Sequence, residues 1–176
     1  MARAQVWVET VIYTMVGLAL IGFVLSLVIP RINEYKDKSI IESTISALDT
    51  IDGKIGQVLS APGNVRVVDF VLKRGYLTID ADADLIKFEL EDSTSVFSEP
   101  GVTIQIGRVN VTTTQQGKKY FVTLILPVDG DLTLKDSTES TKRLSPVAIP
   151  YKLSFENTGI GSEGRPIIAF RESSGA

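Results

Sequence analysis

The chain opens with an unbroken apolar stretch. From Thr10 to Ile29 about 20 residues carry no charged side chain, and at a rise of 1.5 Å per residue such a helix extends over about 30 Å. This is the thickness of the hydrocarbon core of a bilayer. The pattern predicts one long helix that lies in lipid or in an equally apolar helix bundle, with a single carboxylate, Glu9, at its start.

A second helical pattern follows. Apolar residues recur every three or four positions, with polar residues between them: Ile41, Ile45, Leu48, Ile51, Ile55 and Leu59. This spacing predicts an amphipathic helix with one apolar stripe. Pro30 should kink the junction of the two parts, because proline removes a backbone hydrogen bond and clashes with the preceding turn. The predicted rod covers residues 5–60, is about 80 Å long, and ends no later than Pro62-Gly63.

From Val65 onward the hydrophobic period becomes two. Eight runs rich in β-branched and aromatic residues predict strands, at Val65–Leu72, Tyr76–Ile79, Leu85–Leu90, Val102–Thr112, Tyr120–Leu126, Leu132–Leu134, Ala148–Glu156 and Pro166–Arg171. Turn-forming clusters separate them at Glu99–Gly101, Gln115–Gly117, Asp129–Gly130 and Asn157–Gly159, and Lys135–Lys142 reads as a polar loop.

These elements predict an α+β protein. A long N-terminal hydrophobic helix precedes an antiparallel, immunoglobulin-like β-sandwich over residues 64–176. Because the strands alternate, each sheet should bury one face, and one sheet should also take the apolar stripe of the helix.

The amino-acid composition excludes several kinds of functional site. The 176 residues include no cysteine and no histidine, which removes disulfides, thiol nucleophiles, Cys/His zinc sites and Ser-His-Asp triads. The net charge of −3 and the lack of a basic block argue against a nucleic-acid partner. Glu89, Glu91 and Asp92 form no catalytic set with a base or nucleophile, so we expect neither an enzyme nor a cofactor.

The N-terminal run does not fit an ordinary secretory signal. A removable signal peptide has an apolar core of roughly 7–15 residues followed by a small-residue cleavage site. Here the run is longer and ends in Val28-Ile29-Pro30-Arg31, without an Ala-x-Ala site. We therefore expect the helix to remain on the mature protein.

The residues before the run carry a more specific pattern. Arg3 and Ala4 are followed by the uncharged Gln5, by Glu9 four positions later, and then by the apolar run. This pattern resembles the class III signal peptide of the type IV pilin superfamily, and most closely its archaeal pilins and archaellins, since Ala4 stands where bacterial prepilins have glycine. The likeness covers roughly residues 1–60 and extends by architecture to the β-sandwich.

The resemblance implies a complete assembly route. A prepilin peptidase would cut between Ala4 and Gln5 and remove residues 1–4. An assembly ATPase and a membrane platform protein would then move the helix from the cytoplasmic membrane into a helical homopolymer at the cell surface, for adhesion or, in an archaellum, for motility. The alternative from another class is a single-pass membrane-anchored β-sandwich binding module that never polymerises.

Glu9 has two interpretations. A carboxylate is costly inside lipid, less so near its edge, and in the processed chain it would lie one helical turn from the free amine of Gln5. It would then act in processing or assembly, favoured by the positive end of the helix dipole. The alternative is an interfacial residue of an ordinary membrane anchor.

Three weaker patterns complete the candidates. Gly22 and Ser26 form a small-xxx-small pair that lets helices approach closely, although such pairs are common in apolar runs. Asn110-Val111-Thr112 is an N-glycosylation sequon. Asp80, Asp82, Asp84 and Glu91 have the spacing of a calcium-binding EF-hand loop, but the position that needs glycine is Leu85 and the flanks read as strands. We expect a solvated acidic turn there and no metal.

Overall fold

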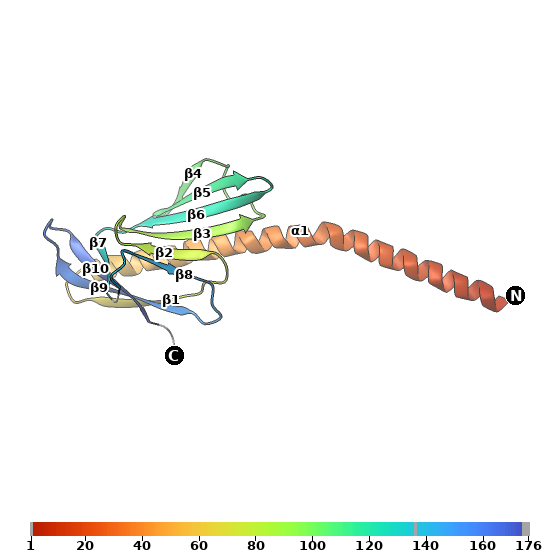
Figure 1. Cartoon of the computed structure of the whole chain (residues 1–176), viewed down its shortest axis with the longest axis horizontal. Coiled ribbons are helices and arrows are strands. Elements are labelled where there is room, and N and C mark those ends of the chain that lie inside the picture. The colour runs from red at the N-terminus through yellow and green to blue at the C-terminus, as the bar shows by residue number, and fades with distance from the viewer. Residues whose placement is uncertain (1, 136, 174–176) are drawn as a thin grey trace.

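The computed structural model describes residues 2–135 and 137–173, with side chains for 7–135 and 137–172. Within these residues one helix, α1 (Ala2–Leu59), precedes ten strands (Figure 1). They are β1 (Val65–Phe70), β2 (Tyr76–Asp80), β3 (Leu85–Ser93), β4 (Thr103–Ile106), β5 (Val109–Gln116), β6 (Lys119–Pro127), β7 (Asp131–Leu134), β8 (Thr141–Leu144), β9 (Tyr151–Ile160) and β10 (Pro166–Ser173).

Helix α1 continues without a break through Pro30, Gly53 and Gly56. Figure 1 shows it changing direction shortly before it enters the β-domain. After Leu59 the chain turns at Gly63, which adopts a φ of +82° and donates its backbone N–H to the Asn157 carbonyl at 2.7 Å. Pro62 cannot continue the helix, so α1 ends at Leu59, shortly before β1 begins at Val65.

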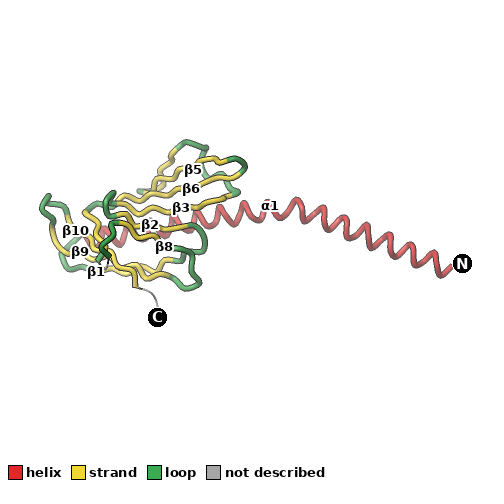
Figure 2. Tube along the Cα trace, in the orientation of Figure 1, coloured by secondary structure: helices red, strands yellow, loops and turns green. Residues whose placement is uncertain are grey.

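The strands form two sheets that face each other across the C-terminal half of α1 (Figure 2). One sheet has the order β1-β9-β10-β7, and the other has the order β4-β5-β6-β3-β2-β8. The neighbours pair antiparallel except for β10 and β7, which are parallel. The prediction of an α+β protein with a β-sandwich after a long apolar helix is confirmed.

The hydrophobic core forms around the second half of α1. Ile41, Leu48, Ile51 and Val58 are fully buried, and α1 contacts β1, β9 and β10 of one sheet and β3, β5 and β6 of the other. The prediction that one sheet takes the stripe was therefore wrong. The buried face is wider than the expected stripe because it also includes Thr44, so it can meet two sheets at once.

Three strand predictions need correction. The run Val102–Thr112 is not one strand but the hairpin β4–β5, because Gly107 takes a φ of +61° and reverses the chain. Strand β8 was missed: it starts inside the expected loop Lys135–Lys142, and only Leu144 of its four residues is buried, so no alternation marks it.

The third correction concerns Asn157–Gly159, which lies within β9 and not in a turn. Ile167 and Ile168 of β10 pair with Gly159 and Asn157, so Thr158 is the extra residue of a β-bulge. The buried Asn157 amide donates to the Val58 carbonyl at 3.2 Å. This hydrogen bond satisfies a backbone carbonyl in the last turn of α1. The tertiary contact outweighs the preference of residues 157–159 for a turn.

Candidate assembly helix and its junction with the domain

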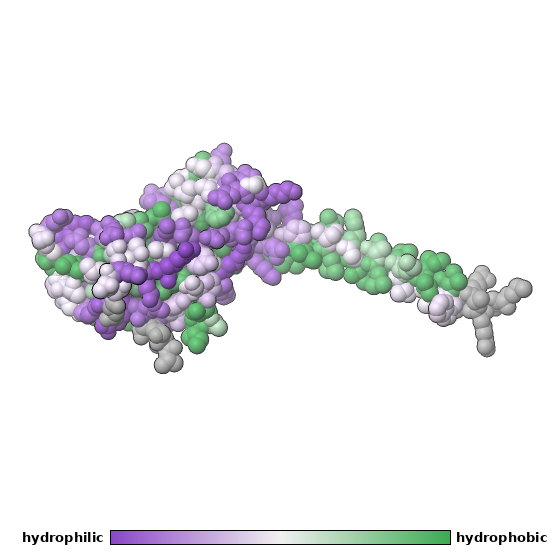
Figure 3. All heavy atoms as spheres, viewed as in Figure 1, coloured by the Kyte–Doolittle hydropathy of each residue, from purple (hydrophilic) through white to green (hydrophobic). Residues whose placement is uncertain are grey.

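The N-terminal half of α1 projects from the β-domain, and the face that Figure 3 shows is mainly apolar. Among the described residues, its large hydrophobic side chains from Trp7 to Ile32 are all exposed in the isolated chain. Full burial would stabilise each of them by roughly 1.5–3 kcal/mol. By length and composition this helix can cross a membrane, which is consistent with membrane anchoring or a signal sequence.

Glu9 lies at the start of this apolar half and is exposed. Its carboxylate accepts a hydrogen bond from the Tyr13 hydroxyl at 3.2 Å, one helical turn away. Sequence analysis missed Tyr13, although its i, i+4 spacing from Glu9 is the signal for such a contact. The backbone of Arg3, Ala4 and Gln5 is helical, but their side chains lie outside the described residues.

Gly22 and Ser26 lie one turn apart on the exposed helix. The Ser26 hydroxyl donates to the Phe23 carbonyl at 2.7 Å, so its polar group is satisfied within the helix. A Cβ placed on Gly22 would meet no atom within 4 Å. The pair therefore leaves a shallow, open surface on which another helix can pack.

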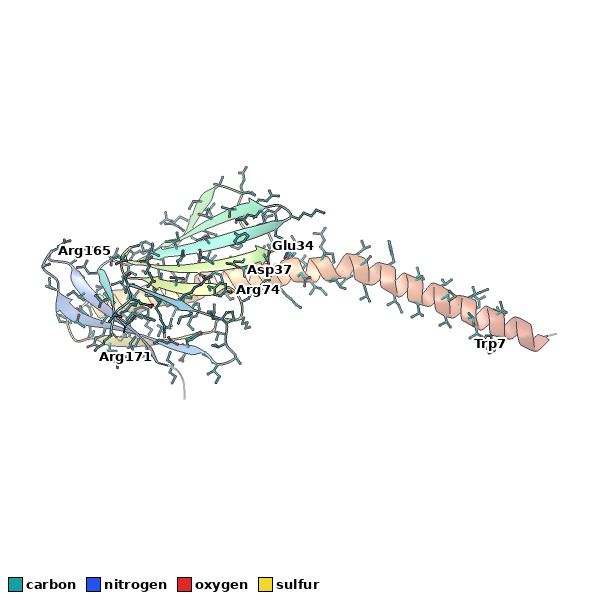
Figure 4. The ribbon with its side chains drawn as sticks, in the orientation of Figure 1. Trp7, Glu34, Asp37, Arg74, Arg165 and Arg171 are labelled. Carbon is teal, nitrogen blue, oxygen red and sulfur yellow. The ribbon has the colours of Figure 1, made fainter. Side chains whose placement is uncertain are left out.

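An ion pair with a buried carboxylate fixes the rod to the domain where the apolar half ends (Figure 4). The Asp37 side chain is only 3 % exposed and pairs with Arg74 from the β1–β2 loop. Its second oxygen accepts the Thr94 backbone N–H at 2.7 Å and the Thr94 hydroxyl at 2.8 Å. Arg74 also donates to the carbonyls of Glu91 and Asp92 at 3.2 and 3.0 Å.

These contacts join α1 to the β1–β2 loop and to the end of β3, and we call them the Asp37 clamp. Sequence analysis treated Asp37 only as one charge among several after Pro30. The signal was present, since Asp37 lies four residues before Ile41 and so falls on the buried face of the helix.

A second charged cluster lies near the other end of α1. Arg108, in the β4–β5 turn, pairs with Asp129 at 2.6 Å and with Asp52 of α1 at 3.2 Å. The pKa of Asp52 lies above its ordinary value of 3.8 because burial disfavours the carboxylate. Repulsion by Asp129 and Asp49 raises this pKa further, while Arg108 lowers it. The pKa of Arg108 is raised above its ordinary value, chiefly by its hydrogen bond to Asp129.

This cluster predicts a pH dependence that Asp52→Asn should remove. Between pH 3.8 and the raised pKa, Asp52 is protonated in the native state but largely ionised in the unfolded chain. The free energy of unfolding therefore falls as pH rises through this range. The variant should therefore gain stability relative to the wild type as pH rises, and should be at least as stable at pH 7. Thermal unfolding of the full chain in detergent at several pH values measures this.

Asp129→Asn provides the matched control for the Asp52 prediction. It removes one source of repulsion and leaves the burial of Asp52, so it should abolish only part of the pH dependence. A wild-type chain that becomes more stable relative to Asp52→Asn between pH 4 and 7 would contradict the assignment.

The EF-hand-like carboxylates do not converge. Asp80 accepts the backbone N–H groups of Asp82 and Ala83, both at 3.1 Å, and so forms a local turn. Asp84 pairs with Arg165, and Glu91 lies near the far end of β3. No group of three or more potential ligands occurs in the described part of the chain.

Asn110 lies in the middle of a sheet and not in a loop. It belongs to β5, where its neighbours across the strands are Gln105 and Ile125. Its side chain is half-buried and alternates with the buried Val109 and Val111, so it points away from the core. Glycosylation of Asn110 stays a prediction.

Glu89, Glu91 and Asp92 each have a cationic neighbour: Lys87 at 3.2 Å, Arg143 at 3.9 Å and Lys119 at 3.2 Å. They therefore serve as partners in surface ion pairs.

Comparison of the chain with protein-family models, with curated proteins and with solved structures found no match. The features that bear on function are therefore the pattern of the N-terminal residues and the geometry of α1.

Proposed function

We propose that the chain is the structural subunit of an archaeal type IV pilus-like surface filament, assembled through its N-terminal hydrophobic helix and serving adhesion. One observation carries this proposal. A single continuous helix is apolar and exposed along its first half, and its second half is the core of a polar β-domain. Such a chain needs an apolar partner along the first half only.

The leader pattern supports a filament over a permanent anchor. Prepilin peptidase would remove residues 1–4, and the assembly ATPase and platform protein would extract the helix from the membrane. Within the filament the apolar halves would pack side by side with the β-domains outside. Moving an apolar helix from lipid to a helix bundle gains little from hydrophobicity, so close packing and polar contacts must select the partner.

Glu9 is the polar contact that we assign to assembly. After processing, the amine of Gln5 would lie one turn away, on the same subunit or on a neighbour, and the pair would neutralise both charges in an apolar surrounding. Tyr13 holds the carboxylate at 3.2 Å. Gly22 and Ser26 would allow a neighbouring helix to approach the same rod more closely.

Two alternatives remain open to experiment. An archaellum subunit would use the same helix for motility. A membrane-anchored binding module would keep its helix in lipid and would never polymerise. The apolar span alone fits this second alternative equally well, but Arg3, Ala4 and Glu9 would then have no common role.

The mature N-terminus is the decisive measurement. We expect mass spectrometry of the natively produced protein to find a chain that starts at Gln5, and negative-stain images of sheared surface material to show filaments. An intact Met1, or a cut beyond Ile29, would exclude the pilin route. A chain starting at Gln5, in cells whose swimming depends on these filaments, would favour the archaellum.

Glu9→Ala should reduce filament yield at least tenfold, because it removes the partner of the new amine and leaves that charge uncompensated in the packed helices. The β-domain should stay folded, since Glu9 lies outside it. Sedimentation of sheared filaments from cells measures the yield.

Glu34→Ala is the matched control for Glu9→Ala. It removes a carboxylate from the same helix, but Glu34 only forms an exposed ion pair with Arg31 at 3.2 Å, which contributes at most about 1 kcal/mol. Wild-type filament yield in Glu9→Ala would show that Glu9 has no role in assembly.

A further inference from the structure

The charged side chains of the β-domain are distributed unevenly between its two ends. We call the end from which the apolar half of α1 emerges the proximal end, and the opposite end the distal end. Figure 4 places Asp37 and Arg74 at the proximal end and Arg165 at the distal end. Strand β3 runs between the two ends, and its nine residues extend over roughly 30 Å.

The proximal end carries unpaired positive charge. Lys36 of α1, Lys73 of the β1–β2 loop and Lys118 of the β5–β6 turn are exposed, and none forms an ion pair within the described residues. Lys36 lines an open cavity of about 390 Å³ together with Arg74 and Lys119. Of the carboxylates beside these lysines, Asp37 pairs with Arg74 and Asp92 with Lys119, whereas Asp69 of β1 lies near Lys73 without an ion pair in the described part of the chain.

The distal end carries unpaired negative charge. Asp80 and Asp82 lie in the β2–β3 turn, and the Ser140 hydroxyl donates to Asp82 at 2.5 Å, which places Glu139 beside them. Glu163 lies in the β9–β10 turn, two residues before Arg165. None of these four carboxylates has an ion pair in the part of the chain that the structure describes, whereas Arg165 is occupied by Asp84 and Asp131.

We propose that the proximal end of one subunit binds the distal end of a second copy of this chain, with Lys36, Lys73 and Lys118 facing the acidic turns. The inference rests on the proposed function, because parallel packing of the apolar helices brings unlike ends of the β-domains together. The contact uses two different surfaces of one chain, so it is head-to-tail and can propagate along a filament.

Exposed apolar residues lie at the same two ends. Val147 and Ile149 are exposed in the β8–β9 loop, which is proximal because Tyr151 pairs with Phe70. Ile160 is 70 % exposed and pairs with Pro166 at the distal end. Each end therefore combines charge with a small apolar surface, as protein interfaces do, and the charges would set the register and the rate of association.

Cross-linking tests the contact directly. A zero-length carbodiimide joins a lysine to a carboxylate only when the two touch. Lys118 and Asp82 lie about one β3 length, or roughly 30 Å, apart in one subunit, so any cross-link between them must join two subunits. We expect mass spectrometry of treated filaments to find proximal lysines linked to the β2–β3 turn or to Glu139. Filaments without such links would overturn the contact.

Charge reversal provides an independent test. Lys73→Glu with Lys118→Glu, and separately Asp82→Lys with Glu139→Lys, should each lower filament yield at least tenfold. All four changes together should restore it, because the opposite signs face each other again. Circular dichroism of each full chain in detergent confirms that it is folded.

Lys54→Glu is the matched control. Lys54 is a lysine of α1 in the distal half of the domain, so its reversal adds negative charge to the acidic end and should leave the yield unchanged.

The outcomes separate this contact from the proposed function. A wild-type chain that forms no filaments overturns both. Normal yield in the reversed pairs overturns the contact alone. The contact is also overturned if Lys73→Glu with Lys118→Glu lowers the yield and the added reversal of Asp82 and Glu139 does not restore it. That result would assign the lysines to anionic lipid headgroups, which face only the proximal end.

Discussion

Asp37→Ala is expected to destabilise the attachment of α1 to the β-domain by about 3 kcal/mol, the lower part of the range for a buried charge pair that loses one partner. Asp37 is almost fully buried, and it bonds Arg74 and two groups of Thr94. Removing the carboxylate leaves the backbone N–H and the hydroxyl of Thr94 without their acceptor, and a donor that loses its partner costs free energy. Arg74 is 41 % exposed, so water can reach it and limits the loss.

Hydrogen exchange and thermal unfolding of the full chain in detergent measure this effect. We expect faster exchange around residues 36–45 and a melting temperature lower by about 10 °C. Asp37→Asn should recover part of the loss, because an amide oxygen can still accept the Thr94 N–H but lacks the charge that Arg74 requires.

Glu34→Ala serves again as the control, since Glu34 lies on the same helix and its ion pair is exposed. Equal melting temperatures for Asp37→Ala and Glu34→Ala would mean that the Asp37 clamp contributes nothing to stability.

Gly75→Ala is expected to destabilise the domain by about 4 kcal/mol or to prevent its folding. Gly75 follows Arg74 and has a φ of +81°, a conformation that costs an L-residue roughly 1–2 kcal/mol. A Cβ there would lie 2.5 Å from the Glu89 carbonyl oxygen and 2.8 Å from the Phe88 ring. The oxygen belongs to the β2–β3 pairing and cannot move away without breaking it, so overpacking adds roughly 1–3 kcal/mol.

Gly63→Ala separates the two causes. Gly63 has nearly the same φ, +82°, but a Cβ there would meet no atom within 4 Å. It should therefore show only the backbone cost of roughly 1–2 kcal/mol. Thermal unfolding of both variants gives the difference, and equal losses would contradict a steric role for the Phe88 and Glu89 contacts.

Both predictions concern the place where the rod meets the domain. The Asp37 clamp and the close approach at Gly75 fix the β1–β2 loop to α1 and to β3. A helix held in this way moves the whole domain with it. If the apolar half is extracted from a membrane and packed in a filament, as we propose, the domain must follow in a defined orientation, which the proximal–distal contact requires.

Local patterns predicted most of the elements because each carries its own period. The charge-free run and the spacing from Ile41 to Leu59 predicted one rod, and α1 is continuous over both. The alternation after Val65 predicted most of the strands. The exceptions had no local signal or a misleading one: Thr141–Leu144 has one buried residue, and Asn157 reads as a turn residue while its amide caps α1.

The residues of the candidate site also fall into a group that the sequence could predict and a group that only the fold brings together. Arg3, Ala4, Gln5 and Glu9 could be selected from the chain because their pattern is contiguous, and Tyr13 could have been added from its spacing. The Asp37 clamp could not be assembled from sequence, since its partners Arg74 and Thr94 lie 37 and 57 residues away.

By itself, then, the amino-acid sequence determined a long rod whose first half is an uncharged apolar run after Glu9, a β-rich domain after it, and the contiguous pattern of Arg3, Ala4, Gln5 and Glu9 at its start. These follow from periodicity and composition, which act within a few residues. Only the tertiary structure decided that both sheets enclose the second half of α1, that the buried Asp37 pairs with the half-exposed Arg74, and that Lys36, Lys73 and Lys118 lie at the opposite end of the domain from the acidic turns. Those features depend on which distant segments pack together, and no local pattern encodes that choice.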